Sequence, residues 1–369
     1  MEPRQEDQAR LEDHAVTTDT TANAGSTGVR EGFRFDEAAL GRWMEAHVEG
    51  YRGPLTVEQF KGGQSNPTYK LITPARSYVL RRKPPGQLIA GAHAVDREAR
   101  VLSALEQADF PVAHVYGLCT DDSVIGSWFY VMELVEGRIV WDATFPEVPR
   151  AERAAHFDAM NAAIARLHTI DYAAIGLSDY GKPGNYFARQ IGRWSRQYLE
   201  DQDAGRDPGM DALIEWLPTA IPAGDETSIV HGDFRCDNMI FHPTEPRILA
   251  VLDWELSTLG HPLADFGYHA MMYRMPPDIV AGLGGADITA LGIPSEADYI
   301  AAYAARTGRS SFADYNFCIA FNFFRLAAIF HGIKGRVIRG TAASAHARDR
   351  AESFPRLVNL ALEAMHGCN

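Results

Sequence analysis

One short segment with strand-like apolar runs, residues 228–253, interrupts a second half whose other apolar patterns have helical spacing. It reads SIVHGDFRCDNMIFHPTEPRILAVLD and contains the apolar runs Ile229–Val230, Met239–Phe241 and Ile248–Leu252. The last two runs flank a turn with two prolines, a pattern that predicts an antiparallel hairpin. Any fold of this chain must therefore place a small sheet inside a mostly helical half.

Polar side chains stand at the ends of these runs. In an antiparallel hairpin the start of the first strand lies beside the end of the second, so Asn238 and Asp253 are expected to meet. Asp233 lies on the loop that enters the hairpin. Mg²⁺ prefers hard oxygen ligands and takes one or two carboxylates plus substrate phosphates, which suits Asn238 and Asp253. Asp233 is then left to accept a proton from a hydroxyl nucleophile.

The spacing of these residues resembles a known catalytic motif. HGDFRCDN at 231–238 matches the pattern H-x-D-x-x-x-x-N, and LDWE at 252–255 matches the position of the metal-binding Asp of protein kinases. Gly after the His, the LDWE run and STLGHPLADFGYH at 257–269 resemble the aminoglycoside phosphotransferase and choline kinase-like family. The whole stretch is most similar to the kinase-like domain that some proteins carry fused to an acyl-CoA dehydrogenase.

This resemblance implies a role for each residue of the motif. Asp233 is the catalytic base or hydroxyl-orienting residue, Asn238 and Asp253 hold Mg²⁺, and Asp265 braces the catalytic loop, with ATP as the co-substrate. The alternative is that these acids only cap a hairpin and neighbouring helices. His231 is expected to pack under the loop rather than to bind a metal.

The implied fold class is α+β, a two-lobed protein-kinase-like fold. Residues 1–32 have almost no large apolar side chains, which predicts a disordered tail. Residues 33–135 are predicted to form a small N-terminal nucleotide-binding lobe with an antiparallel sheet and one helix. Residues 136–369 are predicted to form a larger, mostly helical C-terminal lobe that carries the catalytic and acceptor sites. Its helical patterns lie at Glu152–His168, Asn185–Leu199, Asp211–Leu217, Phe312–Ile333 and Glu352–Met365.

The first lobe must supply a cation for the nucleotide phosphates. Protein kinases use the Lys of V-A-I-K, and here the run VLR ends at Arg81, whose fork suits phosphate or carboxylate. The helix predicted over 92–106 has an apolar stripe formed by Val95, Leu102 and Leu105. Glu98 falls in the same stripe, where a charge is costly without a partner. We expect an Arg81–Glu98 ion pair; the alternative is a solvated Glu98 at the edge of the stripe.

Two further segments are expected to contact the nucleotide. The turn GGQSNP at 62–67 lies between two strand patterns and resembles the G-x-S/A-N turn of aminoglycoside-phosphotransferase-like proteins. Gly63 allows close approach of the backbone to phosphate, and Ser65 and Asn66 can donate hydrogen bonds. The dense apolar strand pattern WFYVMEL ends in a hinge, where backbone groups of Glu133 and Val135 are expected to bind adenine.

Composition excludes several classes of partner. The formal net charge of −13 argues against general binding to nucleic acid or to anionic membranes. We find no apolar run that predicts a membrane span and no signal-peptide pattern at the start. The four cysteines are scattered without a CxxC pair, which is typical of a reducing compartment, so a cytoplasmic location is expected. The oligomeric state is not predicted.

The acceptor is expected to be a small molecule. Its candidate wall, residues 186–196 with 312–339, is rich in cations: Arg189, Arg193, Arg196, Arg325, Lys334, Arg336 and Arg339. Such a wall matches a polycationic aminoglycoside poorly and suits an anionic or acyl-type acceptor, such as a hydroxyacyl-CoA or a hydroxy acid. The alternatives are an aminoglycoside phosphotransferase, a nucleotide-binding pseudokinase that regulates other proteins, and a protein kinase, which the missing D-F-G and A-P-E motifs disfavour.

Overall fold

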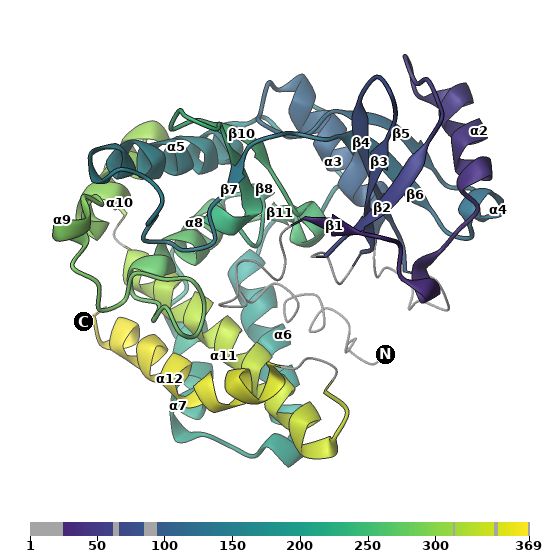
Figure 1. The fold of residues 1–369 in the computed structure, drawn as a ribbon. Helices are drawn as coiled ribbons and strands as arrows, with labels where there is room; N and C mark the ends of the chain where they lie inside the picture. The colour runs from purple at the N-terminus through teal and green to yellow at the C-terminus, as the bar shows by residue number, and fades with distance from the viewer. Residues whose placement is uncertain (1–24, 62–65, 85–93, 313, 343–345, 368–369) are drawn as a thin grey trace.

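A computed structural model describes residues 25–61, 66–84, 94–312, 314–342 and 346–367. It has a small lobe built on one antiparallel sheet and a larger lobe made mostly of helices (Figure 1). The predicted α+β, two-lobed fold is therefore confirmed.

Six strands form the sheet of the small lobe in the order β1-β2-β3-β4-β6-β5, and every neighbouring pair is antiparallel. The strands are β1 (Ser26–Thr27), β2 (Thr56–Phe60), β3 (Thr68–Ile72), β4 (Ser77–Arg82), β5 (Val115–Cys119) and β6 (Phe129–Glu133). The sequence patterns located β2, β3, β4 and β6, but β1 and β5 were not predicted. β1 pairs with Gln59 and Phe60, so Ser26 and Thr27 lie in the sheet although they fall in the segment that was predicted to be a disordered tail.

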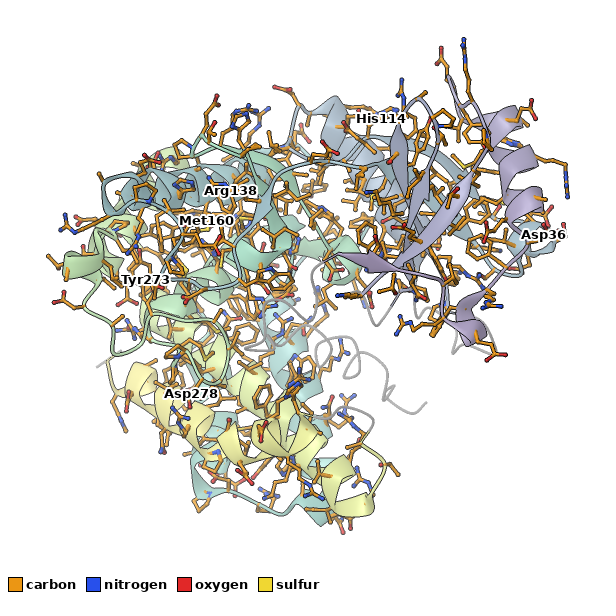
Figure 2. All side chains as sticks on the ribbon, viewed as in Figure 1. Asp36, His114, Arg138, Met160, Tyr273 and Asp278 are labelled. Carbon is orange, nitrogen blue, oxygen red and sulfur yellow. The ribbon has the colours of Figure 1, made fainter. Side chains whose placement is uncertain are left out.

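The described residues of the small lobe form the α-helices α2 (Glu37–His47), α3 (Val95–Gln107) and α4 (Asp122–Ile125), whereas the predicted lobe had one helix. Asp36, labelled in Figure 2, begins α2 by accepting a hydrogen bond from the backbone N–H of Ala39 at 2.9 Å. Leu40, Trp43 and Met44 of α2 pack against Tyr69, Leu71 and Tyr78 of the sheet. Tyr130 instead belongs to the core that contains α3 and the large lobe, so α3 ties the two lobes together.

Two short sheets position the catalytic loop in the large lobe. One has the order β10-β9-β7, formed by β7 (Arg138–Ile139), β9 (Met239–Phe241) and β10 (Ile248–Val251). The predicted hairpin is confirmed, with Met239 opposite Val251 and Phe241 opposite Ile248. The other sheet pairs β8 (Ser228–Val230) with β11 (Thr258–Gly260), so both strands bring their loops to the same place.

The remaining elements of the large lobe are helices: α5 (Arg150–Thr169), α6 (Tyr186–Glu200), α7 (Pro208–Trp216), α8 (Pro262–Ala270), α9 (Ile288–Leu291), α10 (Glu296–Arg306), α11 (Tyr315–Arg339) and α12 (Ala347–His366). The helix α11 is long and apolar enough to resemble a membrane span, although no span was predicted from the sequence. However, 94% of its apolar window is buried inside the protein, where α6, α8 and α12 contact it. It is the central helix of the lower half of this lobe (Figure 1).

Candidate active site

A cavity of about 330 Å³ lies between the lobes, because its lining residues come from both. The small lobe contributes β-strand side chains and the hinge residues Glu133 and Val135. The large lobe contributes the hairpin β9–β10. The predicted residues Arg81, Asn238 and Asp253 all line this cavity, so three of the polar groups proposed from the sequence do meet at one place.

Asp265 of α8 fixes the catalytic loop, residues 231–238, by accepting hydrogen bonds from its backbone. Its carboxylate accepts hydrogen bonds from the backbone N–H groups of His231 and Gly232, each at 2.8 Å, and lies 3.2 Å from Nε2 of His168. Burial alone would raise the pKa of Asp265, but the hydrogen bonds from His168 and His231 and their charges lower it below the ordinary value. Asp265 therefore braces the loop as an ionised carboxylate, as the resemblance implied.

His231 packs beneath the loop and has no room for a metal. Its ring is fully buried, Nε2 lies 2.8 Å from the carbonyl oxygen of Leu252, and Nδ1 accepts the N–H of Asp233 at 3.2 Å. Gly232 next to it has φ +86°, and a Cβ there would lie 3.0 Å from the carbonyl oxygen of Leu256. The loop thus requires glycine at 232 in order to turn tightly against residue 256.

Asp233 is buried, and its two carboxylate oxygens have different neighbours. Oδ1 accepts a hydrogen bond from the hydroxyl of Tyr268 at 2.5 Å and lies 3.1 Å from Nε of Arg235. Oδ2 accepts from the side-chain amide of Asn238 at 2.9 Å. Burial by itself would lower the pKa of Arg235, but the negative charges of Asp233 and Asp237 raise this pKa above its ordinary value. The carboxylate is therefore held in one orientation at the end of the loop.

Asn238 and Asp253 offer oxygen ligands that fit Mg²⁺. The amide nitrogen of Asn238 donates to the carbonyl and the carboxylate of Asp233, which leaves its oxygen on the other side of the amide group. Asp253 has φ +63°, a left-handed conformation that costs a non-glycine residue about 1–3 kcal/mol and is typical of functional sites. Within the described ranges no group of three or more His, Cys, Asp or Glu is arranged to hold a metal. One carboxylate plus one amide oxygen is the donor set that Mg²⁺ completes with phosphates.

Arg81 lies at the centre of a buried cluster of carboxylates. Its Nε is 2.8 Å from Glu98, and its Nη2 is 2.9 Å from Asp253 and 3.3 Å from Glu255. The predicted Arg81–Glu98 pair is confirmed, and the solvated alternative for Glu98 is wrong. Burial raises the pKa of Glu98 to about 7; Arg81 opposes that shift, while Glu255 and Asp253 add to it. Burial would lower the pKa of Arg81, but the surrounding carboxylates raise it well above the ordinary value.

Two further segments were predicted to contact the nucleotide, the turn at 62–67 and the hinge after β6. Asn66 is fully buried, and its amide donates to Glu98 at 2.8 Å and to Glu255 at 3.2 Å. In this position the amide supports the carboxylates around Arg81, and phosphate binding by Asn66 stays a prediction. Gly63 and Ser65 lie outside the described residues. The N–H of Glu133 donates to the carbonyl of His114 at 2.8 Å, and adenine binding by the hinge stays a prediction.

Comparison with known proteins assigns the chain to a family. The family model described as "Phosphotransferase enzyme family" matches residues 56–315, which covers most of both lobes. The chain belongs to this phosphotransferase family. Among curated proteins, the chain is 41% identical over 336 residues to mouse acyl-CoA dehydrogenase family member 10, covering 90% of this chain and 31% of that protein. It is 42% identical over 349 residues to chicken acyl-CoA dehydrogenase family member 11, covering 92% and 44%. It therefore spans less than half the length of these relatives.

Solved structures agree with the fold of this phosphotransferase. A Ralstonia eutropha protein, described as a candidate aminoglycoside phosphotransferase, is 54% identical with a TM-score of 0.84, covering 90% of this chain and 98% of its own. Choline kinase from Cryptosporidium parvum has a TM-score of 0.60 at 11% identity, covering 90% and 97%. The aminoglycoside phosphotransferase APH(4)-Ia, in a ternary complex with AMP-PNP and hygromycin B, has a TM-score of 0.57 at 14% identity, covering 90% and 99%. The last two likenesses show the fold alone.

Several residues of this phosphotransferase site were not assigned from the sequence. Glu255 and Tyr268 lie inside motifs that were recognised, but no role was given to them. A signal for Tyr268 existed, since it stands three residues after Asp265 on a helix and so shares its face. Arg235 had no such signal, because its position beside Asp233 depends on how the loop turns. His168 follows the apolar stripe of α5, and only the packing of α5 against α8 brings it to Asp265.

We expect the brace at Asp265 to be a strong determinant of stability. Asp265→Asn should lower the free energy of unfolding at pH 7 by about 3–5 kcal/mol, because it breaks a buried, charge-assisted network. The folded pKa of Asp265 is depressed, so its contribution is present above the unfolded pKa of about 3.9 and is lost as pH falls through the folded value. Urea unfolding of both proteins between pH 7 and pH 3 should show the difference shrinking at the acid end. An equal difference at every pH would contradict this role for Asp265.

Proposed function

We propose that this chain transfers the γ-phosphate of ATP, in the presence of Mg²⁺, to a hydroxyl group of a small acceptor with an acyl or carboxylate group. The observation that carries the proposal is that Asn238, Asp253 and Arg81 converge at one cavity between two lobes, and that the carboxylate of Asp233 accepts a hydrogen bond from Asn238. The cavity provides a hinge at one end and oxygen ligands at the other. This arrangement matches the needs of phosphoryl transfer, which depends mainly on positioning and charge stabilisation.

Each residue has a task in that reaction. Asn238 and Asp253 would hold Mg²⁺, which when bound neutralises charge on the phosphates. Arg81 lies 2.9 Å from Asp253 and supplies a fixed positive charge at the phosphate end of the cavity. Asp233 accepts the hydrogen bond of the acceptor hydroxyl and aligns its oxygen with the phosphorus atom. The contacts of Asp233 with Tyr268 and Asn238 support an orienting role, because both hold the carboxylate in one plane.

Two observations support an acyl-type acceptor. Acyl-CoA dehydrogenase family members 10 and 11 share about two-fifths of their matched residues with this chain, and their names refer to acyl-CoA. The candidate acceptor wall is basic, although Arg339 is paired with Asp201 and Asp203 at 2.7 and 3.1 Å and so contributes little free charge. A hydroxyacyl-CoA or a hydroxy acid satisfies both observations. A polycationic aminoglycoside satisfies neither.

The proposal is tested by ATP consumption with Mg²⁺ against four classes of acceptor: hydroxyacyl-CoAs, hydroxy acids, choline-like alcohols and aminoglycosides. We expect turnover with the first or second class, and none in an Asp233→Ala blank. Turnover with aminoglycosides alone would establish the alternative acceptor. Binding of Mg-ATP without turnover of any acceptor would favour a nucleotide-binding pseudokinase.

A further inference from the structure

Arg325, in the middle of α11, is a buried cation with an unusual environment. Its exposure is 9%, yet no carboxylate of a described residue lies within ion-pair distance of it. Arg81 and Arg235 are paired with acids of the active site and Arg339 with Asp201, whereas the buried Arg82 is held by the hydroxyl of Ser127. A buried charge without a partner costs several kcal/mol, so its retention calls for a ligand or a function.

The position of Arg325 connects it to the catalytic loop. Its Nη2 donates to the carbonyl oxygen of Gly232 at 3.3 Å, and this is its single hydrogen bond to the described part of the chain. Its guanidinium carbon lies 5.4 Å from the centre of the Tyr268 ring, a cation–π distance. The hydroxyl of the same Tyr268 donates to Asp233. One tyrosine side chain therefore spans the gap between Arg325 and the carboxylate that orients the acceptor hydroxyl.

A guanidinium has five N–H donors, and the carbonyl of Gly232 uses one of them. None of the nitrogen atoms of Arg325 is among the fully buried, unbonded polar atoms of the described residues. The remaining donors are therefore not completely buried. Arg325, Tyr186 and Tyr268 are also absent from the residues that line the cavity between the lobes. The donors of Arg325 thus lie outside the lining of the nucleotide cavity.

Tyr186, at the start of α6, interacts electrostatically with the same arginine. It is 8% exposed, and its hydroxyl makes no hydrogen bond with a described residue. Burial raises the pKa of its phenol, while the positive charge of Arg325 is the strongest influence that lowers it. Its ring is held against Gly260, where an added Cβ would lie 2.7 Å from the ring. The ring is thus fixed in place beside Gly260.

We propose that Arg325, assisted by the hydroxyl of Tyr186, binds the carbonyl or carboxylate oxygen of the acceptor whose hydroxyl is oriented by Asp233. The inference rests on the proposed function and sharpens it. The acceptor class is a short hydroxy acid or its thioester, with the oxygen-bearing carbon and the hydroxyl on one short chain, because only Tyr268 separates the two sites. A simple alcohol has no group for Arg325 and should be a poor ligand.

Equilibrium binding by calorimetry tests this without any need for turnover. The protein is saturated with Mg-AMP-PNP, and three probes are titrated: 3-hydroxybutyryl-CoA, 3-hydroxybutyrate and 1,3-butanediol, which lacks the carbonyl. We expect the wild type to bind the first two more tightly than the diol. Arg325→Met should weaken the binding of these two probes about 10–100-fold, since a hydrogen bond to a charged group is worth about 1.5–3 kcal/mol. Arg325→Lys should recover part of this affinity.

Controls separate a binding role from a structural one. Arg356→Met removes one charge from an exposed ion pair on α12 and should leave the affinities for all probes unchanged. Tyr186→Phe keeps the ring against Gly260, removes only the hydroxyl, and should weaken the two carbonyl probes by a smaller factor. The affinity for AMP-PNP and the melting temperature of each variant show whether the fold is intact.

The outcomes distinguish this inference from the proposed function. Unchanged affinity of the carbonyl probes in both Arg325→Met and Tyr186→Phe would overturn the assignment, as would a wild type that binds none of the three or binds the diol equally well. Carbonyl probes that bind through Arg325 without being phosphorylated would support the assignment and count against the proposed function. Phosphorylation with an acceptor KM that Arg325→Met does not raise would support the proposed function and refute the role of Arg325.

Discussion

Asp233→Asn should lower kcat for phosphoryl transfer by about 10²–10⁴-fold while leaving the affinity for Mg-ATP within a few-fold of the wild type. The reason is that Asp233, in the function proposed above, orients the acceptor hydroxyl, and that it does not line the nucleotide cavity. Asparagine has the same shape but cannot accept two hydrogen bonds from the donors that surround it. Single-turnover kinetics with the best acceptor of the panel, together with nucleotide binding, provide the measurement.

A matched control is available on the surface. Asp278 pairs with Arg356 on the exterior of the protein, and its side chain is labelled in Figure 2. Asp278→Asn makes the same chemical change at an exposed ion pair, where little effect is expected. If Asp233→Asn kept more than about a tenth of the wild-type kcat, Asp233 would not be the orienting carboxylate.

Arg81→Met should destabilise the protein by about 3–5 kcal/mol at pH 8, because it leaves Glu98, Asp253 and Glu255 close together without their common cation. Nucleotide affinity should fall in the same variant, since the charge at the phosphate end of the cavity is gone. Arg81→Lys keeps the positive charge but lacks the guanidinium that spans the carboxylates. The stability of this variant should therefore lie between that of the wild type and that of Arg81→Met. Urea unfolding and AMP-PNP titration measure both effects.

The pH dependence of this loss has a definite sign. The folded pKa of Glu98 is raised to about 7, above the value in the unfolded chain, so the folded state binds the extra proton and stability declines as pH rises through this window. Glu98 should therefore ionise with greater difficulty without Arg81. The destabilisation of Arg81→Met should shrink as pH falls from 8 toward 7, because Glu98 then takes up its proton in both folded proteins. Glu98→Gln in the same background should remove much of this pH dependence. A destabilisation that does not change between pH 8 and pH 6 would mean that Glu98 is not the titrating group.

The sequence was a good guide wherever function depends on local spacing. The motif HGDFRCDN and the run LDWE stand at the two ends of one hairpin, so pairing of β9 with β10 was enough to bring Asn238 near Asp253. Glu98 could be placed because a charge in an apolar helical stripe requires a partner, and Arg81 was the nearest suitable cation. Helices with long apolar stripes, such as α5 and α11, were located for the same reason.

Other features depend on packing between distant segments, and no local pattern contains them. Strands β1 and β5 are short, and they are strands because an existing sheet offers them edges to pair with. The contacts of Asn66 with Glu98 and Glu255 were not predicted, because these two acids meet only when α3 and the turn after β10 are packed together. The side-chain direction of a turn residue follows from such neighbours and not from the turn itself.

The sequence alone therefore determined the family, the two-lobed fold and the three polar residues Asp233, Asn238 and Asp253, since these follow from spacing along one hairpin and its loop. Only the tertiary structure decided which cations are committed to partners and which are not. The seven basic residues of the acceptor wall look alike in the sequence, yet Arg339 is neutralised by Asp201 and Asp203, whereas Arg325 is buried without a carboxylate among the described residues. That difference arises because electrostatic pairing depends on distance in space, which sequence separation does not give.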